Sequence, residues 1–221
     1  MIDQLTIGAL SSYDDFEASL KERKINAPKK KIIKETVPYS NLVYDFSSID
    51  GEAYWNERTL EYTFEITAKT PLELEEKKRP FLEWIMNIAN ADIYDPHIED
   101  FHFVGTFEDI SIDDSEIEKA TITVTFSAYP YMIANTKRTG IYSITSVEKV
   151  VHITNNSSHR VTPTFYCDID YSVEVGDAKY SVTAGELTDD NIKLSQGINA
   201  IKVASIGGTG ILKIEFLEEV F

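Results

Sequence analysis

Residues 59–67 constrain the fold of this chain more than any other stretch, because their side chains alternate without a break. The polar side chains fall on one face, and the other face carries Leu60, Tyr62, Phe64 and Ile66. A period of two residues is typical of a β-strand with one buried and one exposed face. The stretch contains neither proline nor glycine, so it suits a long central strand. We therefore expect a β-sheet built around residues 59–67.

One helix is predicted directly after this strand. Thr70 can cap its N-terminus, Pro71 suits the first helical position, and Glu73 completes a capping box. Apolar residues then recur at helical spacing as far as Ile88. Pro80 removes one backbone hydrogen bond from the middle of this pattern, so we expect a kink or two abutting helices there.

Further strands are predicted on both sides of this pair of elements. Residues 29–39 and 41–46 have the composition of two strands. Residues 101–112 and 116–132 favour a hairpin, because the second arm alternates apolar and polar residues and residues 113–115 have turn chemistry.

A domain boundary is predicted within residues 132–142, because residues 135–140 lose apolar periodicity and have the composition of a linker. After the linker, short strands are separated at regular intervals by turns that contain glycine, which is typical of a small β-sandwich. We expect a mainly β protein. Its N-terminal domain, residues 1–134, would be a β-sheet or split barrel with one helix, and its C-terminal domain, residues 141–221, a β-sandwich.

Composition excludes several classes of protein. The formal net charge of −16 opposes binding to nucleic acid or to an anionic membrane surface. The apolar runs are too short to span a bilayer, and the N-terminus lacks the features of a signal peptide. A single cysteine, Cys167, excludes an intrachain disulfide, and its apolar neighbours predict a buried thiol on a strand. Synthesis in a reducing cytoplasm is the simplest interpretation.

Charge is distributed unevenly along the chain. Residues 21–34 hold seven lysines or arginines against one glutamate, whereas residues 92–118 hold ten carboxylates and no lysine or arginine. Opposite patches on one chain suit head-to-tail self-association, although two solvated faces of a monomer would look the same. The candidate subunit contacts are Lys29, Lys30 and Lys31 on the basic side and Asp109, Asp113 and Asp114 on the acidic side.

No catalytic, cofactor or metal site is predicted. Residues 95–102 hold two histidines and three carboxylates, but their spacing matches no known metal-ligand motif. Residues 207–210 are rich in glycine but lack the lysine of a phosphate-binding loop. We therefore expect a protein that is not an enzyme; the enzymatic alternative would need a metal bound at residues 95–102.

Several short motifs follow one another in a distinctive order. They lie at residues 13–16, 37–39, 54–64, around Trp84 in the predicted helix, and at 92–105, 128–131, 194–199 and 210–214. In order and spacing they resemble the distal tail protein family of long-tailed, non-contractile bacteriophages, the siphovirus type. The resemblance extends over nearly the whole chain.

The resemblance implies a structural protein of the virion tail tip, made in a bacterial host by a phage or prophage. Such proteins form hexameric rings in which the N-terminal domain closes the ring and the C-terminal domain projects outward. The implied partners are other copies of the chain, the tail tube protein, the tail-tip hub or tail-associated protein and the tape-measure protein. DNA passes through the ring without specific binding, and no membrane is involved. The alternative is a carbohydrate-binding β-sandwich that contributes to host adhesion, with Tyr171 and Tyr180 as candidate sugar contacts.

Overall fold

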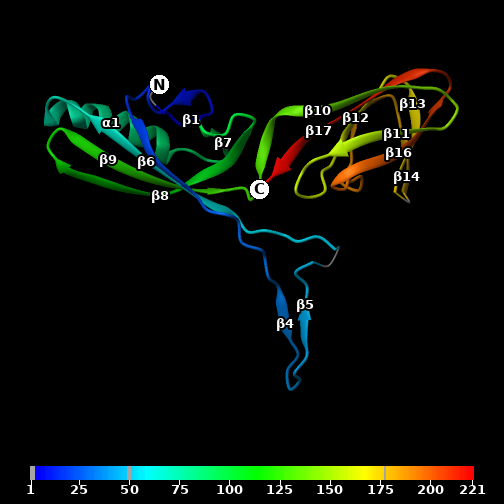
Figure 1. The fold of residues 1–221 in the computed structure, drawn as a ribbon, viewed down its shortest axis with the longest axis horizontal. Helices are drawn as coiled ribbons and strands as arrows, with labels where there is room; N and C mark the ends of the chain where they lie inside the picture. The colour runs from blue at the N-terminus through cyan, green and yellow to red at the C-terminus, as the bar shows by residue number, and fades with distance from the viewer. Residues whose placement is uncertain (1–2, 49–50, 177) are drawn as a thin grey trace. The chain divides into compact units, whose positions relative to one another are not determined.

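The computed structural model describes residues 3–48, 51–176 and 178–221, and Figure 1 shows its fold. The chain forms two compact units, and each is described by itself. The first comprises residues up to Met132 together with Phe221, and the second comprises residues 133–220. Both are built mainly from antiparallel strands, so the expected mainly β fold with one helix is confirmed.

The first unit contains one large antiparallel sheet. Its strand order is β3–β6–β9–β8–β7–β1–β2. The strands are β1 (Thr6–Ile7), β2 (Leu10–Ser11), β3 (Ser19–Ile25), β6 (Arg58–Thr67), β7 (Ala91–Tyr94), β8 (Phe101–Glu116) and β9 (Lys119–Ala128). The alternating stretch is β6, which pairs with β3 on one side and β9 on the other. Its four apolar side chains at positions 60, 62, 64 and 66 are completely buried, as the pattern predicted.

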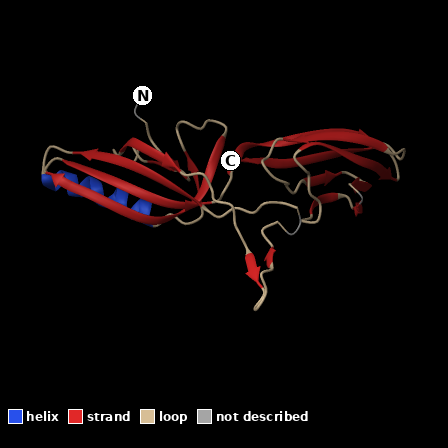
Figure 2. Ribbon diagram, turned by 60° about the horizontal axis from the view of Figure 1, so that its bottom comes forward, coloured by secondary structure: helices blue, strands red, loops and turns tan. Residues whose placement is uncertain are grey.

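Helix α1 (Pro71–Met86) packs against β6 and β9 and lies along this sheet in Figure 2. Thr70 accepts a hydrogen bond from the backbone N–H of Glu73 at 3.2 Å, and the Glu73 carboxylate accepts one from the N–H of Lys69 at 2.9 Å. The ring of Phe81 meets that of Phe64 edge-on, with 5.2 Å between centroids. The predicted capping and the buried helical face are both present.

Pro80 does not divide the helix into two, so the second of the two alternatives that we expected is wrong. It lies on the exposed side of one continuous helix. The carbonyl that loses its hydrogen bond belongs to Glu76, which is also exposed, so water can satisfy it and the helix continues.

The hairpin of β8 and β9 is present, but its turn lies further along the chain than residues 113–115. The two strands stay paired from Gly105 with Ala128 to Glu116 with Lys119. The residues that have turn chemistry lie instead within β8, at an irregularity in the register between Asp113 and Glu116. The turn therefore falls at Ile117 and Glu118.

Strands β4 (Lys34–Thr36) and β5 (Val43–Asp45) form a separate two-stranded sheet, shorter than the two strands expected over residues 29–46. We call residues 34–45 the arm; Figure 1 shows it apart from the large sheet. All six strand residues of the arm are exposed. The arm therefore has no hydrophobic core of its own, and its strand side chains are not covered by other parts of the described chain.

The second unit is a β-sandwich, as expected. Its two sheets have the orders β15–β12–β17–β10 and β11–β16–β13–β14. The strands are β10 (Met132–Ile144), β11 (Lys149–Asn155), β12 (Thr164–Cys167), β13 (Asp170–Val175), β14 (Ala178–Val182), β15 (Gly185–Thr188), β16 (Gly197–Ile206) and β17 (Gly210–Val220). Apolar side chains from both sheets share one core, in which Cys167 is buried.

Residues 135–140, which we expected to be a linker, form part of a strand. They lie inside β10, which pairs with β17. Most side chains in this part of β10 are exposed, so the strand needs no apolar face and its sequence carries no alternation. Across the described ranges, no helix is both long and apolar enough to cross a membrane.

Candidate functional site

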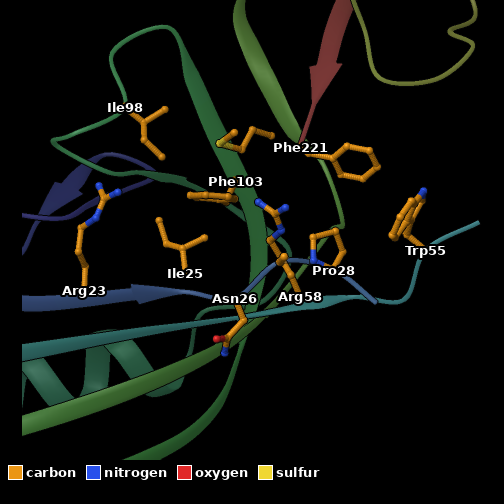
Figure 3. A pocket seen from close by; sticks show the side chains of 11 residues that line it. Arg23, Ile25, Asn26, Pro28, Trp55, Arg58, Ile98, Phe103 and Phe221 are labelled. Atoms are coloured by element: carbon orange, nitrogen blue, oxygen red, sulfur yellow. The ribbon is translucent and has the colours of Figure 1, made fainter. Parts of the chain in front are cut away.

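A pocket of about 470 Å³ opens at the end of the first unit's sheet, where β3 ends and β6 begins. Figure 3 shows the side chains that line it. Most of the lining is apolar and comes from segments that are distant in sequence, among them Ile25, Pro28, Trp55, Phe103 and Phe221. The ring of Phe221 packs against that of Trp55, with 4.8 Å between centroids.

Arg58 is the unusual member of this lining. Only 5% of its surface is exposed, and its Nε atom has no hydrogen-bond partner. Its guanidinium lies over the ring of Phe103, 5.5 Å from the centroid, and it forms no ion pair with any described residue. Burial lowers the pKa of Arg58. The side chain nevertheless stays charged, because an arginine does not deprotonate in a protein near neutral pH. The pocket therefore contains an uncompensated positive charge.

Arg23, on the wall of the same pocket, has the opposite environment. Its Nη1 atom lies 2.5 Å from the carboxylate of Asp95, which is 3% exposed. The same carboxylate accepts hydrogen bonds from the Tyr62 hydroxyl at 3.0 Å and from the N–H of His97 at 2.9 Å. Burial and, next, the charge of Asp95 raise the pKa of Tyr62 far above its ordinary value. This network is internally neutral and needs no outside partner.

The weak metal candidate at residues 95–102 is therefore part of the framework. Asp95 is engaged by Arg23 and Tyr62, while His97 and His102 point to separate carboxylates, those of Asp3 and Asp92, at 3.4 and 3.5 Å. Within the described ranges, no group of three or more metal-ligating side chains converges.

The three candidate lysines lie beside the pocket. Their backbone is tied to the segment before β6, since Lys30 pairs with Trp55 and the N–H of Lys31 donates to the carbonyl of Tyr54 at 2.7 Å. Lys29, Lys30 and Lys31 are all exposed, and none forms an ion pair within the part of the chain that the structure describes. They form a basic rim next to Pro28.

The three candidate aspartates lie on the exposed part of β8. Asp113 accepts a hydrogen bond from the N–H of Ser115 at 3.1 Å, and hydrogen bonding from Ser115 lowers its pKa. Asp114 lies 3.1 Å from Nζ of Lys78 on the helix, so part of its charge is compensated locally. Asp109 accepts from the N–H of Ile110 at 2.8 Å.

The structure does not bring these two groups together within one chain. Along β6, Arg58 pairs with Ala128, whereas Thr67 pairs with Lys119 at the hairpin turn. Nine residues of strand separate the two levels, about 30 Å at about 3.3 Å per residue. Asp113 and Asp114 therefore lie toward the end of the sheet opposite the basic rim, whereas Asp109, whose partner Thr125 also pairs with Glu61, lies three residues along β6 from the level of Arg58.

The candidate sugar contacts in the second unit differ from each other. Tyr171 is completely buried, and its hydroxyl donates to the carboxylate of Asp168 at 2.8 Å, so it offers no surface for a sugar. Tyr180 is half-buried and lines a separate cavity of about 850 Å³, where its hydroxyl donates to the carbonyl of Asn191 at 3.2 Å.

Sequence reasoning missed Arg58, although the sequence contains a signal for it. Arg58 is in phase with Leu60 and Tyr62, so the alternation of β6 places this arginine on the buried face of the strand. A charged residue at a position that the pattern reserves for an apolar one is a reason to look for its partner. The contribution of Phe221 to the pocket has no comparable signal.

No known protein-family model matches this sequence, and no curated protein matches it either. Solved structures do match over the full length. The fold is similar to that of the SPP1 Dit (gp 19.1) protein, described as a paradigm of the hub adsorption apparatus in phages that infect Gram-positive bacteria. The TM-score is 0.69 at 12% identity, covering 98% of this chain and 99% of that one. A chain of the phage P2 baseplate in its activated conformation with Ca also matches, with a TM-score of 0.41 at 10% identity, covering 97% and 98% of the two chains. The chain thus has the fold of the SPP1 Dit protein.

Proposed function

We propose that this chain is a distal tail protein of a phage or prophage, a structural component that forms a ring at the tip of the tail. The observation that carries the proposal is the similarity of its fold to SPP1 Dit over 98% of the chain. The order of sequence motifs resembles the same family. The protein would act through its shape and its contacts and not by catalysis.

The placement of charge supports a ring built from identical contacts. The basic rim at one end of the sheet and the carboxylates of Asp113 and Asp114 toward the other end suit a heterologous contact, in which each copy uses two different surfaces. Repeated contacts of this kind close into a ring when a whole number of rotations from one copy to the next adds up to a full turn. In this proposal Lys29, Lys30 and Lys31 of one copy meet Asp109, Asp113 and Asp114 of the next.

The arm supports association independently of charge. Four of its apolar side chains are more than half exposed: Tyr39, Leu42, Val43 and Tyr44. A group of exposed apolar side chains without a core is typical of a surface that another chain covers. We assign the arm to a contact with a neighbouring copy or with another tail component.

In this proposal residues 1–134 close a ring of six copies, and residues 141–221 project outward. The ring joins the tail tube to the tail-tip hub and tail-associated protein, and the tape-measure protein is a further partner. DNA passes through its channel. A net charge of −16 would keep DNA from adhering to the channel wall.

The decisive experiment measures mass in solution by size-exclusion chromatography with multi-angle light scattering. Wild-type protein is expected as a ring of six copies. Changing Lys29, Lys30 and Lys31 to glutamate is expected to shift it to monomers; three changes are needed because one exposed ion pair contributes only about 0–1 kcal/mol.

A matched control makes the same change in charge on the second unit, at the exposed residues Lys149, Lys179 and Lys193. The control is expected to remain a ring. A wild-type protein that is monomeric at every concentration would contradict the proposal, and a ring that tolerates the first triple change would contradict the electrostatic contact.

A second candidate function, binding of a carbohydrate by the second unit, rests on the cavity beside Tyr180. Asn191 and Asn199 also line this cavity, and one aromatic face with amide groups suits a sugar. Screening the full chain on a glycan array, with Tyr180→Ala as the control, tests it. Signals that are equal for the two proteins would remove this candidate.

A further inference from the structure

We propose that the pocket around Arg58 receives the β8–β9 turn of a neighbouring copy, with Ile117 entering its apolar part and Glu118 pairing with Arg58. The inference rests on the proposed function, because it identifies the contact that would join the copies of the ring. It goes further by naming a receiving site and an inserting segment that neither the fold nor the charge pattern specifies.

The first step is that the pocket lacks an anion. An arginine that is 5% exposed, with a buried Nε atom that lacks a hydrogen-bond partner and with no ionic partner, is unfavourable, because a buried charge is stable only when paired or hydrogen-bonded. The chain does supply a carboxylate for Arg23, on the wall of the same pocket, but supplies none for Arg58 within the described residues. The partner of Arg58 is therefore expected on another molecule.

The second step is that the occupant must also be apolar. Ile25, Pro28, Trp55 and Phe221 surround the arginine with hydrocarbon and aromatic surface. A hydrated inorganic anion would leave that surface wet. An occupant that presents an aliphatic group next to a carboxylate matches both features, and a cavity of about 470 Å³ has room for several side chains.

The third step is that the β8–β9 turn has this chemistry. Ile117 is 73% exposed at the tip of the hairpin and lies between two glutamates. Glu116 is paired with Lys119 at 3.1 Å, but Glu118 is exposed and forms no ion pair within the described residues. The carbonyl of Glu118 accepts a hydrogen bond from Ala68 at 2.9 Å, which anchors the turn on the sheet.

The fourth step is that one copy cannot fill its own pocket. The turn and the pocket lie at opposite ends of β6, about 30 Å apart at about 3.3 Å per residue. Each copy therefore offers a pocket at one end and a turn at the other, which is the arrangement of a head-to-tail contact. Charges around the two surfaces are also complementary. The exposed Lys29 beside the pocket is positive, and the exposed Asp113 near the turn is negative.

Cross-linking tests the placement directly. Asn26 lines the pocket at an exposed position, so Asn26→Cys and Ile117→Cys place thiols on the two sides of the proposed contact. A short bismaleimide should link the two single variants to each other in a mixture, and should convert the double variant into a ladder that ends at the mass of the ring. Pairing Ile117→Cys with Ile211→Cys, at an exposed site in the second unit, serves as the control and should give no ladder.

A double-mutant cycle tests the ion pair. Arg58→Met keeps most of the volume of the side chain, and Glu118→Gln changes one exposed group. Each should raise the dissociation constant of neighbouring copies about 30-fold, and the double variant should be little weaker than either single variant. Tryptophan fluorescence would confirm that the Arg58→Met protein is folded.

The outcomes separate this inference from the proposed function. The contact proposed here is overturned if the wild-type protein forms a ring but residues 26 and 117 do not cross-link. It is also overturned if the effects of the two substitutions in the cycle are strictly additive. Either result leaves the ring in place. A monomer in light scattering overturns the proposed function itself. A pocket that instead binds a small aliphatic carboxylate, such as octanoate, without any effect on association also overturns the contact.

Discussion

Replacing Arg58 by methionine is expected to stabilise the first unit of an isolated copy, even though the arginine is almost completely buried. Methionine is unbranched and of similar length, so it can follow the path of the arginine stem and leave little empty space. The change removes a guanidinium that has no ionic partner and a Nε–H that has no acceptor. Most substitutions of a residue that is 5% exposed are destabilising, so the expected sign is unusual.

The magnitude follows from two opposing contributions. A buried donor without a partner destabilises the folded state by about 1–3 kcal/mol. The interaction of the guanidinium with the ring of Phe103, 5.5 Å away, stabilises the folded state by about 0.5–2 kcal/mol. The substitution removes this interaction too. The free energy of unfolding should therefore rise by about 1 kcal/mol.

The matched control is Arg23→Met, on the wall of the same pocket. It removes the cation that lies 2.5 Å from the carboxylate of Asp95, which is 3% exposed. Leaving a buried carboxylate without its partner destabilises a protein by about 3 kcal/mol or more. Two arginine-to-methionine changes in one pocket are thus expected to act with opposite signs.

The assay is urea unfolding of dilute, monomeric protein, followed by tryptophan fluorescence. Trp55 and Trp84 are the only tryptophans in the chain and both belong to the first unit, so the signal reports that unit alone. If Arg58→Met lowered the free energy of unfolding by more than about 1 kcal/mol, the guanidinium would be satisfied within the chain and the reasoning would be refuted.

Three further expectations concern the rest of the chain. Replacing Thr70 by alanine removes the cap of the helix and should lower the free energy of unfolding of the first unit by about 1 kcal/mol, with serine restoring most of it in the same fluorescence assay. Burial raises the pKa of Cys167 to about 11 from 9.0, so the thiol stays protonated in the folded chain at a pH where it ionises in the unfolded one. The stabilisation is complete below pH 9 and is lost as the pH rises through 11; a Cys167→Ala variant should lack this alkaline loss in urea unfolding followed by far-UV circular dichroism. A methyl group added at Gly210 would overlap the Asp168 carboxylate and the Tyr171 hydroxyl, so Gly210→Ala should lower the stability of the second unit by about 1–3 kcal/mol, measured as faster reaction of the Cys167 thiol with a disulfide reagent.

The elements predicted well are those whose signal is local. The alternation of residues 59–67 depends on one buried face, and β6 has that face. The start of α1 depends on Thr70, which accepts the hydrogen bond that its position implies, and on Glu73, whose carboxylate accepts from the N–H of Lys69, one residue before the cap. Capping and periodicity act within a few residues, so a sequence contains all the information that they need.

The elements predicted badly depend on pairing with other strands. Residues 135–140 form part of β10 because β17 supplies their hydrogen bonds, and no apolar face was required. Residues 113–115 have the composition of a turn, yet β9 pairs on past them as far as Glu116. In each case pairing with another strand overrides the local preference of the segment.

The walls of the pocket could not be predicted from the sequence, whereas its buried arginine could. Its apolar walls come from β3, the segment before β6, and Phe221, and no pattern in one segment could have assembled them. Arg58 itself could have been identified from the sequence. It is a charged residue at a position of β6 that is in phase with the buried apolar residues. Natural chains keep such violations mainly where function requires them.

This is why the sign of the Arg58 substitution matters for function as well as for stability. If the arginine served the fold, its pocket would contain a carboxylate of this chain, as the pocket wall does for Arg23. With no such group among the described residues, arginine at position 58 is expected to make an isolated copy less stable than methionine would. The charge becomes favourable only when another molecule brings a carboxylate into the pocket, so a variant that folds more stably and associates more weakly would locate the role of Arg58 at the contact between copies.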